Sequence, residues 1–208
     1  MMKLYYAPGA CSQAVHILLH ETGVDHETEL VDLRAKRTAT GADYWAVNPK
    51  GAVPALDIGH GEVLTENAAI LQYLGDLSGN STLLPPVGEL RRYRVLEWLN
   101  FIATELHKGF GPLWNPNASA DSKQGARDLL GKKFDYVEQH FGPGPFLLGE
   151  HLTIADPYLF VMANWTGVHD IDLGRWPGLV AFTRRMRERP AVQIVLHAEG
   201  LVEEEVAS

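Results

Sequence analysis

The decapeptide KLYYAPGACS at residues 3–12 decides the class of fold. Lys3 to Ala7 predicts a short strand, Pro8-Gly9 predicts a turn, and the apolar residues from Ser12 to Glu21 recur at helical spacing. Cys11 therefore lies where a turn passes into a helix. A strand followed at once by a turn and a helix indicates an α/β structure at the start of the chain.

The residues that follow extend this pattern to about residue 78. The predicted order is β-α-β-α-β-β-α, with parallel strands in the first half and a hairpin at the end. The later elements are a strand at 27–32, a short helix at 43–47, strands at 53–58 and 63–64, and a helix at 66–77. With Cys11 at the first turn, this order predicts a thioredoxin-like domain over residues 1–80.

Residues 78–88 are rich in Ser, Gly, Asn and Pro, which is typical of a linker. The pattern beyond the linker is helical, so an all-α domain is expected over residues 87–208. Its predicted helices are 89–110, 121–140 (stopped by Gly142-Pro143-Gly144-Pro145), 177–189 and 191–198. Another begins with Thr153 as its cap, and Asp156 is expected to bond back to that cap. Pro157 would then occupy the fourth helical position, which predicts a local distortion.

The composition is that of an ordinary globular protein. Hydrophobic residues make up 46% of the 208 residues and charged residues 21%. We expect no membrane association, because the apolar runs are too short to cross a bilayer and no signal peptide is visible. A formal net charge of −8, to which Glu203-Glu204-Glu205 contributes, argues against nucleic-acid binding. A single cysteine excludes an internal disulfide framework and favours the cytoplasm.

Cys11 is the first candidate for chemistry. At the start of a helix, free amides and the helix dipole favour the thiolate form. A lone cysteine is more often a small buried apolar residue, but the strand-turn-helix context favours the functional interpretation. The segment CSQA at 11–14 has no second cysteine, so dithiol chemistry is excluded and an external thiol is the expected partner.

Two further motifs predict where such a thiol would bind. Val53-Pro54 leads into a strand, and a cis proline there would turn the Val53 backbone toward an extended thiol peptide. The alternative is an ordinary trans proline at the start of a strand. Thr65-Glu66-Asn67 opens the next helix, whose free amides would bind a carboxylate while Glu66 takes an ammonium group. The same three residues could instead serve only as a helix cap.

A polar stripe is expected on the first long helix of the second half. Its members recur at i, i+4, i+7 and i+8, with a glutamate beside them: Asn100, Thr104, His107, Lys108 and Glu105. A stripe of this kind is usually a solvated face. The apolar sequence around it, WL at 98–99 and FI at 101–102, favours a cleft instead.

Two smaller groups are open to a functional interpretation. His16 and His20 have the i, i+4 spacing of metal ligands, but no carboxylate or third ligand accompanies them, so no metal is expected. Arg34, Lys36 and Arg37 form a basic run that is most simply a solvated loop. One of its cations could take a substrate carboxylate.

Taken together, these motifs resemble the bacterial beta-class glutathione S-transferases. The matching segments are KLYYAPGACS (3–12), NPKGAVPAL (48–56), LTE (64–66), EWLN (97–100), TELHKGF (104–110) and LTIAD (152–156). The resemblance spans almost the whole chain. It implies the glutathione transferase fold, glutathione as co-substrate without a metal, and a cytoplasmic homodimer that serves detoxification.

The resemblance also implies roles for individual residues. Cys11 and His107 are the implied catalytic residues, with Cys11 near the glutathione sulfur. Val53 pairs its backbone with the cysteinyl unit, and Glu66 and Asn67 hold the γ-glutamyl end. The residues near the glycyl end and the sulfur are Lys36, His107 and Lys108. Those that reach the ligand across a dimer interface are Asn100, Thr104 and Glu105. Tyr6 matches the activating tyrosine of other classes in a secondary role.

The implied reaction is conjugation of glutathione to small hydrophobic electrophiles. Two alternatives stay open at this point. Cys11 could form a mixed disulfide with glutathione, and so transfer thiols or remove halide from aromatic compounds. The same scaffold could also serve as a ligand carrier without catalysis, because a fold does not dictate a function.

Overall fold

The computed structural model describes residues 1–141 and 144–202. The acidic run at 203–205 and the first two residues of the helix stop, 142–143, lie outside the described residues. Within the described part, no helix is both long and apolar enough to cross a membrane.

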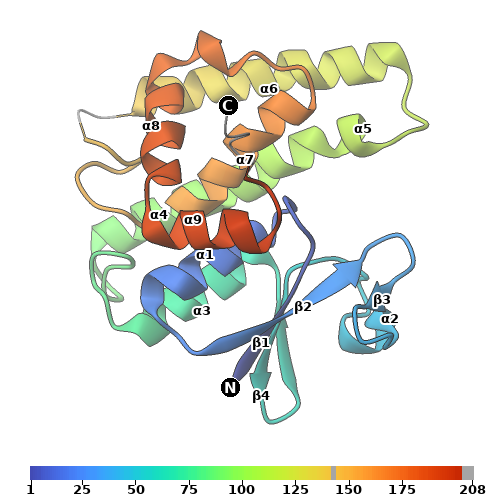
Figure 1. The fold of residues 1–208 in the computed structure, drawn as a ribbon. Coiled ribbons are helices and arrows are strands. Elements are labelled where there is room, and N and C mark those ends of the chain that lie inside the picture. Colours follow the sequence, from blue (N-terminus) through green and yellow to red (C-terminus); the bar gives the residue numbers. More distant parts are fainter. Residues whose placement is uncertain (142–143, 203–208) are drawn as a thin grey trace, which may run out of the picture.

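The first 78 residues confirm the predicted α/β arrangement (Figure 1). A mixed sheet has the order β3-β2-β1-β4-β5. Its strands are β1 (Met2–Tyr6), β2 (His26–Asp32), β3 (Arg37–Thr38), β4 (Ala55–Gly59) and β5 (Glu62–Thr65). β1 runs parallel to β2 with Met2 opposite His26, and β4 and β5 form the predicted hairpin. The two-residue β3 was not predicted, because only its pairing with β2 makes it a strand.

Three helices accompany the sheet: α1 (Gln13–Thr22), α2 (Tyr44–Val47) and α3 (Asn67–Ser78). α1 contacts α3 as well as helices of the second half, so every residue from Gln13 to Leu19 is buried. Gly23 ends α1 with a φ of 66°, a left-handed conformation that glycine adopts without strain. The strand-turn-helix unit around Cys11 is therefore enclosed from both halves of the chain.

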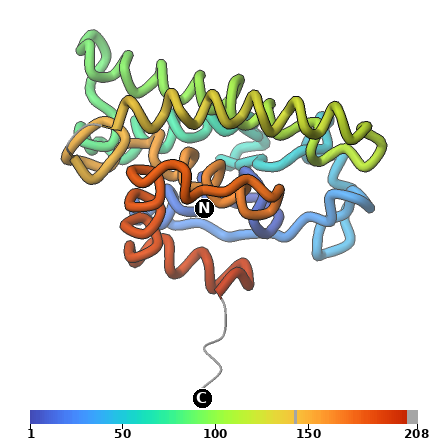
Figure 2. The backbone as a smooth tube through the Cα atoms, turned by 90° about the horizontal axis from the view of Figure 1, so that it is seen from above, coloured from blue at the N-terminus to red at the C-terminus, as the bar shows by residue number. Residues whose placement is uncertain are grey.

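The second half of the described chain is helical, as predicted (Figures 1 and 2). Its elements are α4 (Leu90–Phe101), η1 (Ile102–His107), η2 (Lys108–Phe110), α5 (Gly111–Trp114), α6 (Ala120–His140), α7 (Asp156–Val168), η3 (Leu173–Arg175), α8 (Pro177–Arg187) and α9 (Pro190–Ala198). Figure 2 shows α6 running along one side of the molecule. α7 is buried along most of its length and contacts both α1 and α8.

The prediction of a single α-helix at 89–110 is wrong in one respect. The helical path continues, but η1 is a π-helical segment and η2 a 3₁₀ turn. A π turn holds more residues than an α turn, so it rotates the following side chains relative to an α-helix. The spacing that placed Asn100 and His107 on one stripe therefore does not hold.

The start of α7 also differs from the expectation. Asp156 does bond back to Thr153, accepting from its backbone N at 2.7 Å and its Oγ1 at 2.8 Å, and it accepts from Leu147 N at 2.9 Å. The helix begins at Asp156, two residues later than predicted, so Pro157 is its second residue. A proline in the first turn gives up no helical hydrogen bond. The predicted distortion at a fourth position is therefore wrong.

One buried core runs through both halves. It joins Leu4 and Leu56 of the sheet with Leu99 of α4 and Phe160 of α7. Each fully buried aliphatic or aromatic side chain contributes about 1.5–3 kcal/mol to folding. The division at residues 80 and 87 stays a prediction, because this core is shared across it.

Candidate functional site

A cavity of about 890 Å³ opens between the sheet half and the helical half. This volume is in the range of sites that hold small ligands. Residues from both halves line it: from the first, Ala7–Cys11, Leu33, Lys36, Asn48, Lys50–Pro54 and Thr65–Asn67; from the second, Ala103, Thr104, His107, Lys108, Trp114, Tyr158 and Trp165. The structure thus brings together eight of the predicted site residues: Cys11, Lys36, Val53, Glu66, Asn67, Thr104, His107 and Lys108.

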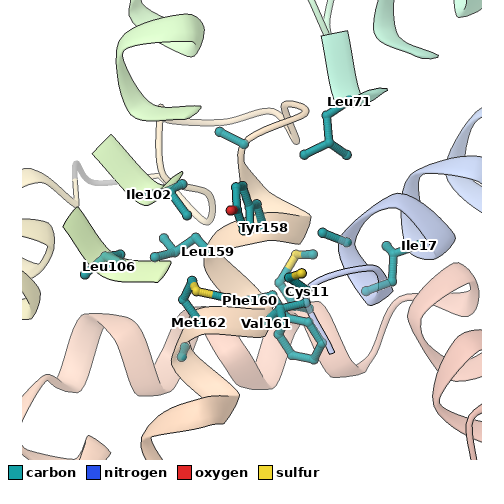
Figure 3. Close-up of a cluster of buried hydrophobic side chains, with 14 of the residues drawn as sticks. Cys11, Ile17, Leu71, Ile102, Leu106, Tyr158, Leu159, Phe160, Val161 and Met162 are labelled. Carbon is teal, nitrogen blue, oxygen red and sulfur yellow. The ribbon is translucent and has the colours of Figure 1, made fainter. Parts of the chain in front are cut away.

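Cys11 lies at the inner wall of this cavity. Its side chain is among the buried residues next to α7, and Figure 3 shows it close to Val161 and Tyr158. The thiol donates to the carbonyl oxygen of Val53, with 3.1 Å between Sγ and O. The Val53-Pro54 peptide bond is cis. Sequence-distant Cys11 and Val53 are therefore in direct contact.

The Cys11 thiol is not activated toward the thiolate in this structure. Burial raises its pKa to about 12, and the backbone amides of Cys11 and Ser12 and the charge of Lys108 only partly oppose this. The expectation that the helix start favours the thiolate is thus wrong. The physical reason is that loss of hydration at a site 8% exposed outweighs the helix amides. At neutral pH Cys11 is an S–H donor.

Asn67 faces Cys11 rather than the open cavity. Its Nδ2 donates to the Cys11 carbonyl at 2.8 Å, and its side chain is buried. Within the described residues its Oδ1 is buried and has no hydrogen-bond partner. The side chain thus fixes the Cys11 turn rather than reaching toward a ligand carboxylate. The backbone amide of Asn67, at the start of α3, is still available to a ligand.

His107 is paired with a tyrosine that the sequence did not point to. Nδ1 of His107 lies 2.6 Å from the hydroxyl of Tyr158 on α7. Burial lowers the pKa of His107 to about 4, with the neighbouring Lys108 acting in the same direction and Glu66 against it. Burial also raises the pKa of Tyr158 above its usual range. Both side chains are therefore neutral at pH 7.

Charged groups surround the mouth of the cavity. Lys50 pairs with Glu66 at 2.6 Å and donates to Thr65 Oγ1 at 3.0 Å. The hydrogen bond that Lys50 donates to the Glu66 carboxylate is the main reason that the pKa of Glu66 is below its usual value. Lys36 donates to the carbonyl of Gly51 at 2.6 Å. With Lys108, three lysines and one glutamate give the lining a net charge of +2, in a chain whose formal charge is −8.

Three predicted site residues do not line the cavity. Tyr6 is not among the lining residues, and its ring centroid lies 5.4 Å from that of His16. Its secondary role toward glutathione stays a prediction. Asn100 is exposed, and Glu105 pairs with Lys133 at 2.6 Å. The π turn explains why Thr104 and His107 face the cavity while Asn100 does not. Contact of Asn100 or Glu105 with the ligand of a second copy stays a prediction.

Several lining residues that could act on a ligand were not singled out from the sequence, among them Lys50, Tyr158 and Trp165. Lys50 belongs to the NPKG segment, and its charge beside the proline motif was a usable signal. Tyr158 and Trp165 gave no signal, because only the packing of α7 brings them to the cavity. Trp114 belongs to the segment at 112–116, which the sequence places at the electrophile pocket. Trp165 donates from Nε1 to the carbonyl of Gly9 at 2.8 Å, which holds the turn before Cys11 in place.

Comparison with known proteins identifies the family. Residues 9–77 match the family model "Glutathione S-transferase, N-terminal domain", and residues 101–190 match "Glutathione S-transferase, C-terminal domain". The chain belongs to the glutathione S-transferase family. It is 48% identical to glutathione S-transferase GstA of Escherichia coli O157:H7 over 200 residues, which is 96% of this chain and 100% of that protein. This similarity supports glutathione transferase activity.

Solved structures agree with this assignment. The beta-class glutathione S-transferase of Sphingomonas chungbukensis is 41% identical, with a TM-score of 0.92 over 96% of this chain and all of that one. A sphingomonad glutathione S-transferase complexed with glutathione is 42% identical, with a TM-score of 0.92 over the same shares of the two chains. The resemblance to the bacterial beta class and the predicted glutathione S-transferase fold are therefore confirmed.

Proposed function

We propose that this glutathione transferase conjugates glutathione to small hydrophobic electrophiles, and that the cavity at Cys11 is the active site. The observation that carries the proposal is the convergence of an S–H donor, a neutral imidazole and a net positive lining on one cavity. Glutathione carries two carboxylates and one ammonium group at neutral pH. A lining with three lysines and one glutamate complements this charge pattern.

The ends of glutathione are assigned by charge. Glu66 takes the ammonium group, and the first amides of α3 with Lys50 take the adjacent carboxylate. Lys36 and Lys108 lie on the parts of the lining left for the glycyl carboxylate and the sulfur. The Val53 backbone pairs with the cysteinyl unit. This pairing would release the Cys11 thiol from the Val53 carbonyl, so that it can donate to the incoming sulfur.

Two neutral donors then stabilise the glutathione thiolate. A thiol has an ordinary pKa of about 8.5, so transferring its proton to His107, with a pKa of about 4, costs about 6 kcal/mol. We therefore assign the proton to solvent rather than to His107. With the Tyr158 hydroxyl donating to Nδ1 of His107, Nε2 carries a proton and can donate to the thiolate. Each hydrogen bond to a charged group contributes about 1.5–3 kcal/mol, or 1–2 units of thiol pKa.

The electrophile takes the apolar part of the cavity. Ala103, Trp114 and Trp165 lie there, and an aromatic substrate can stack against the indoles. The thiolate attacks the electrophilic carbon and a carbon–sulfur bond forms. A halide leaves as its anion with the bonding electrons. In an epoxide one carbon–oxygen bond breaks, and the oxygen stays on the neighbouring carbon and takes a proton from solvent. Enclosure by both halves of the chain removes water that would weaken these contacts.

We further propose that the chain acts as a cytoplasmic homodimer in detoxification, with the thioredoxin-like part at 1–80 and the helical part at 87–208 as its two domains. Asn100, Thr104 and Glu105 would then reach the glutathione of the second copy. Sedimentation of the Glu105→Ala variant and glutathione titration of the same sample test the two parts of this proposal separately.

The direct test is a conjugation assay with a panel of halogenated arenes and epoxides. A glutathione-dependent rate above the uncatalysed rate is expected, and calorimetry should show one glutathione site per chain. Absence of binding would overturn the proposal. Binding without turnover on any electrophile would favour the carrier alternative. Thiol transfer through Cys11 is less well supported, because its thiol is not ionised at neutral pH.

A further inference from the structure

Three histidines form a cluster outside the lining of the cavity. His16 and His20 come from α1, and His26 is the first residue of β2. One ring nitrogen of each lies within 4.8 Å of those of the other two. The expectation that no third ligand accompanies His16 and His20 is wrong. The chain enters β2 shortly after α1 ends, and this brings His26 beside the two helix histidines.

Hydrogen bonds set the tautomers of two of these rings. Nδ1 of His16 lies 2.9 Å from Glu199 Oε1, and the other oxygen of that carboxylate accepts from Gly9 N at 2.9 Å and Gln13 Nε2 at 3.0 Å. Because a carboxylate in this position only accepts, Nδ1 of His16 carries the proton. Nδ1 of His26 donates to the carbonyl of Val24 at 2.7 Å in the same way. In the neutral form of either ring, Nε2 then has the lone pair.

We propose that His16, His20 and His26 bind a divalent transition-metal ion of the zinc type. Neutral imidazole nitrogen is a preferred ligand of Zn²⁺, and three protein ligands with an open fourth position are a common arrangement. Histidines that bind metals usually donate their other N–H to a carboxylate or a backbone carbonyl. Glu199 and the Val24 carbonyl supply both kinds of partner.

The geometry needs only a small adjustment. Tetrahedral Zn²⁺ with metal–nitrogen distances of about 2.0–2.1 Å places its ligand atoms about 3.4 Å apart. The widest pair would therefore close by about 1.4 Å, which rotation of the half-buried His20 and His26 side chains can supply.

The site is separate from the proposed active site. Its ligands do not line the cavity at Cys11. One carboxylate connects the two, because Glu199 orients His16 and also accepts from the amide of Gly9 at the rim of the cavity. The metal proposal does not depend on the conjugation proposal, and its test needs no glutathione, which itself binds Zn²⁺.

The test is titration of the untagged, chelator-treated chain with Zn²⁺ against a chromogenic chelator. One Zn²⁺ per chain is expected. His20→Gln and His26→Gln should each weaken binding at least about 10-fold, while His151→Gln, at an exposed histidine of a loop, should not. Co²⁺ in place of Zn²⁺ should give the visible bands of a tetrahedral ion in the wild-type chain and in His151→Gln only. At 100-fold excess over its dissociation constant, Zn²⁺ should raise Tm by about 5–10 °C.

Two results would overturn the inference. One is the absence of stoichiometric Zn²⁺ binding by the folded wild-type chain. The other is equal loss or equal retention of binding in His20→Gln and His151→Gln, which would place the metal elsewhere. Circular dichroism of each variant ensures that a loss of binding is not a loss of fold. The two variants on different elements, α1 and β2, provide independent readings.

Discussion

Replacing Cys11 with alanine should leave most of the conjugating activity in place. A pH of 7 is five units below the Cys11 pKa of about 12, so about one molecule in 10⁵ carries the Cys11 thiolate. Free glutathione, with an ordinary thiol pKa of about 8.5, is already about 3% ionised. The glutathione sulfur therefore has the larger thiolate population by about three orders of magnitude, and Cys11 serves it as a hydrogen-bond donor.

The magnitude follows from what the substitution removes. Cys11→Ala deletes one S–H donor. Because a thiol is a weaker donor than an imidazole N–H, its hydrogen bond to the thiolate should contribute only about 0.5–1.5 kcal/mol, so kcat/KM should fall about 2- to 10-fold. Loss of the buried sulfur and of its hydrogen bond to the Val53 carbonyl should lower the free energy of unfolding by about 1–2 kcal/mol. Cys11→Ser is the matched control, because its hydroxyl keeps a donor but cannot form a disulfide. It should recover activity toward the wild-type value.

The assay is steady-state conjugation of a chlorinated nitroarene at pH 7, with the fold of each variant checked by thermal denaturation. A loss on the order of 10³-fold or more in both folded variants would refute the reasoning, because it would require Cys11 to act as a nucleophile. Thiol transfer to a disulfide substrate, measured on the same variants, should disappear in both if that reaction proceeds through a mixed disulfide with Cys11.

Other predictions concern the remaining parts of the site and the core. His107→Ala should lower kcat/KM about 10- to 100-fold, whereas His107→Gln should keep part of the donor function; Tyr158→Phe should have a smaller effect. Because the pKa of His107 is about 4, the wild-type pH–rate profile between pH 6 and 9 should show one ionisation, that of bound glutathione, and a second one at the histidine would contradict this. Glu66→Gln should raise KM for glutathione about 10-fold, because the ammonium group loses its charged partner. Tm should change little, since the Glu66 side chain is mostly exposed. An unchanged KM would contradict the assigned contact with the ammonium group. Asp156→Ala should cost about 3–5 kcal/mol of unfolding free energy in denaturant titrations, because three buried donors lose their acceptor. Burial raises the pKa of Asp156 to about 6, above that of an unfolded aspartate. Protonation of Asp156 therefore stabilises the folded state below about pH 4, and this stabilisation is lost as the pH rises through 6. The free energy of unfolding of Asp156→Asn should lack this pH dependence.

The fold could be predicted because its signals are local. The segment at 3–12 contains most of a strand and a turn, and it leads directly into α1. The turn residues Gly59-His60-Gly61 join two strands that pair as a hairpin. Alternation of apolar and polar residues with a period of two or 3.6 requires knowledge only of neighbours in the chain. The π-helical η1 escaped prediction, because apolar periodicity does not distinguish an α turn from a π turn.

Site residues were predictable where a motif carried them. Val53, Glu66 and Cys11 belong to such motifs and meet at one cavity. Tyr158 does not, because its part in the site depends on α7 crossing near His107. Lys50 was within a quoted motif, but its pairing with Glu66 exists only because the two segments on either side of the hairpin meet.

The amino-acid sequence alone determined that an α/β half is followed by a helical half, with a lone thiol at the first turn. Tertiary structure decided the ionisation of that thiol and of His107, because burial acts through everything that surrounds a group and not through its neighbours in the chain. It also decided that His26 joins His16 and His20, since the way α1 packs beside the start of β2 depends on the whole fold and not on helical spacing.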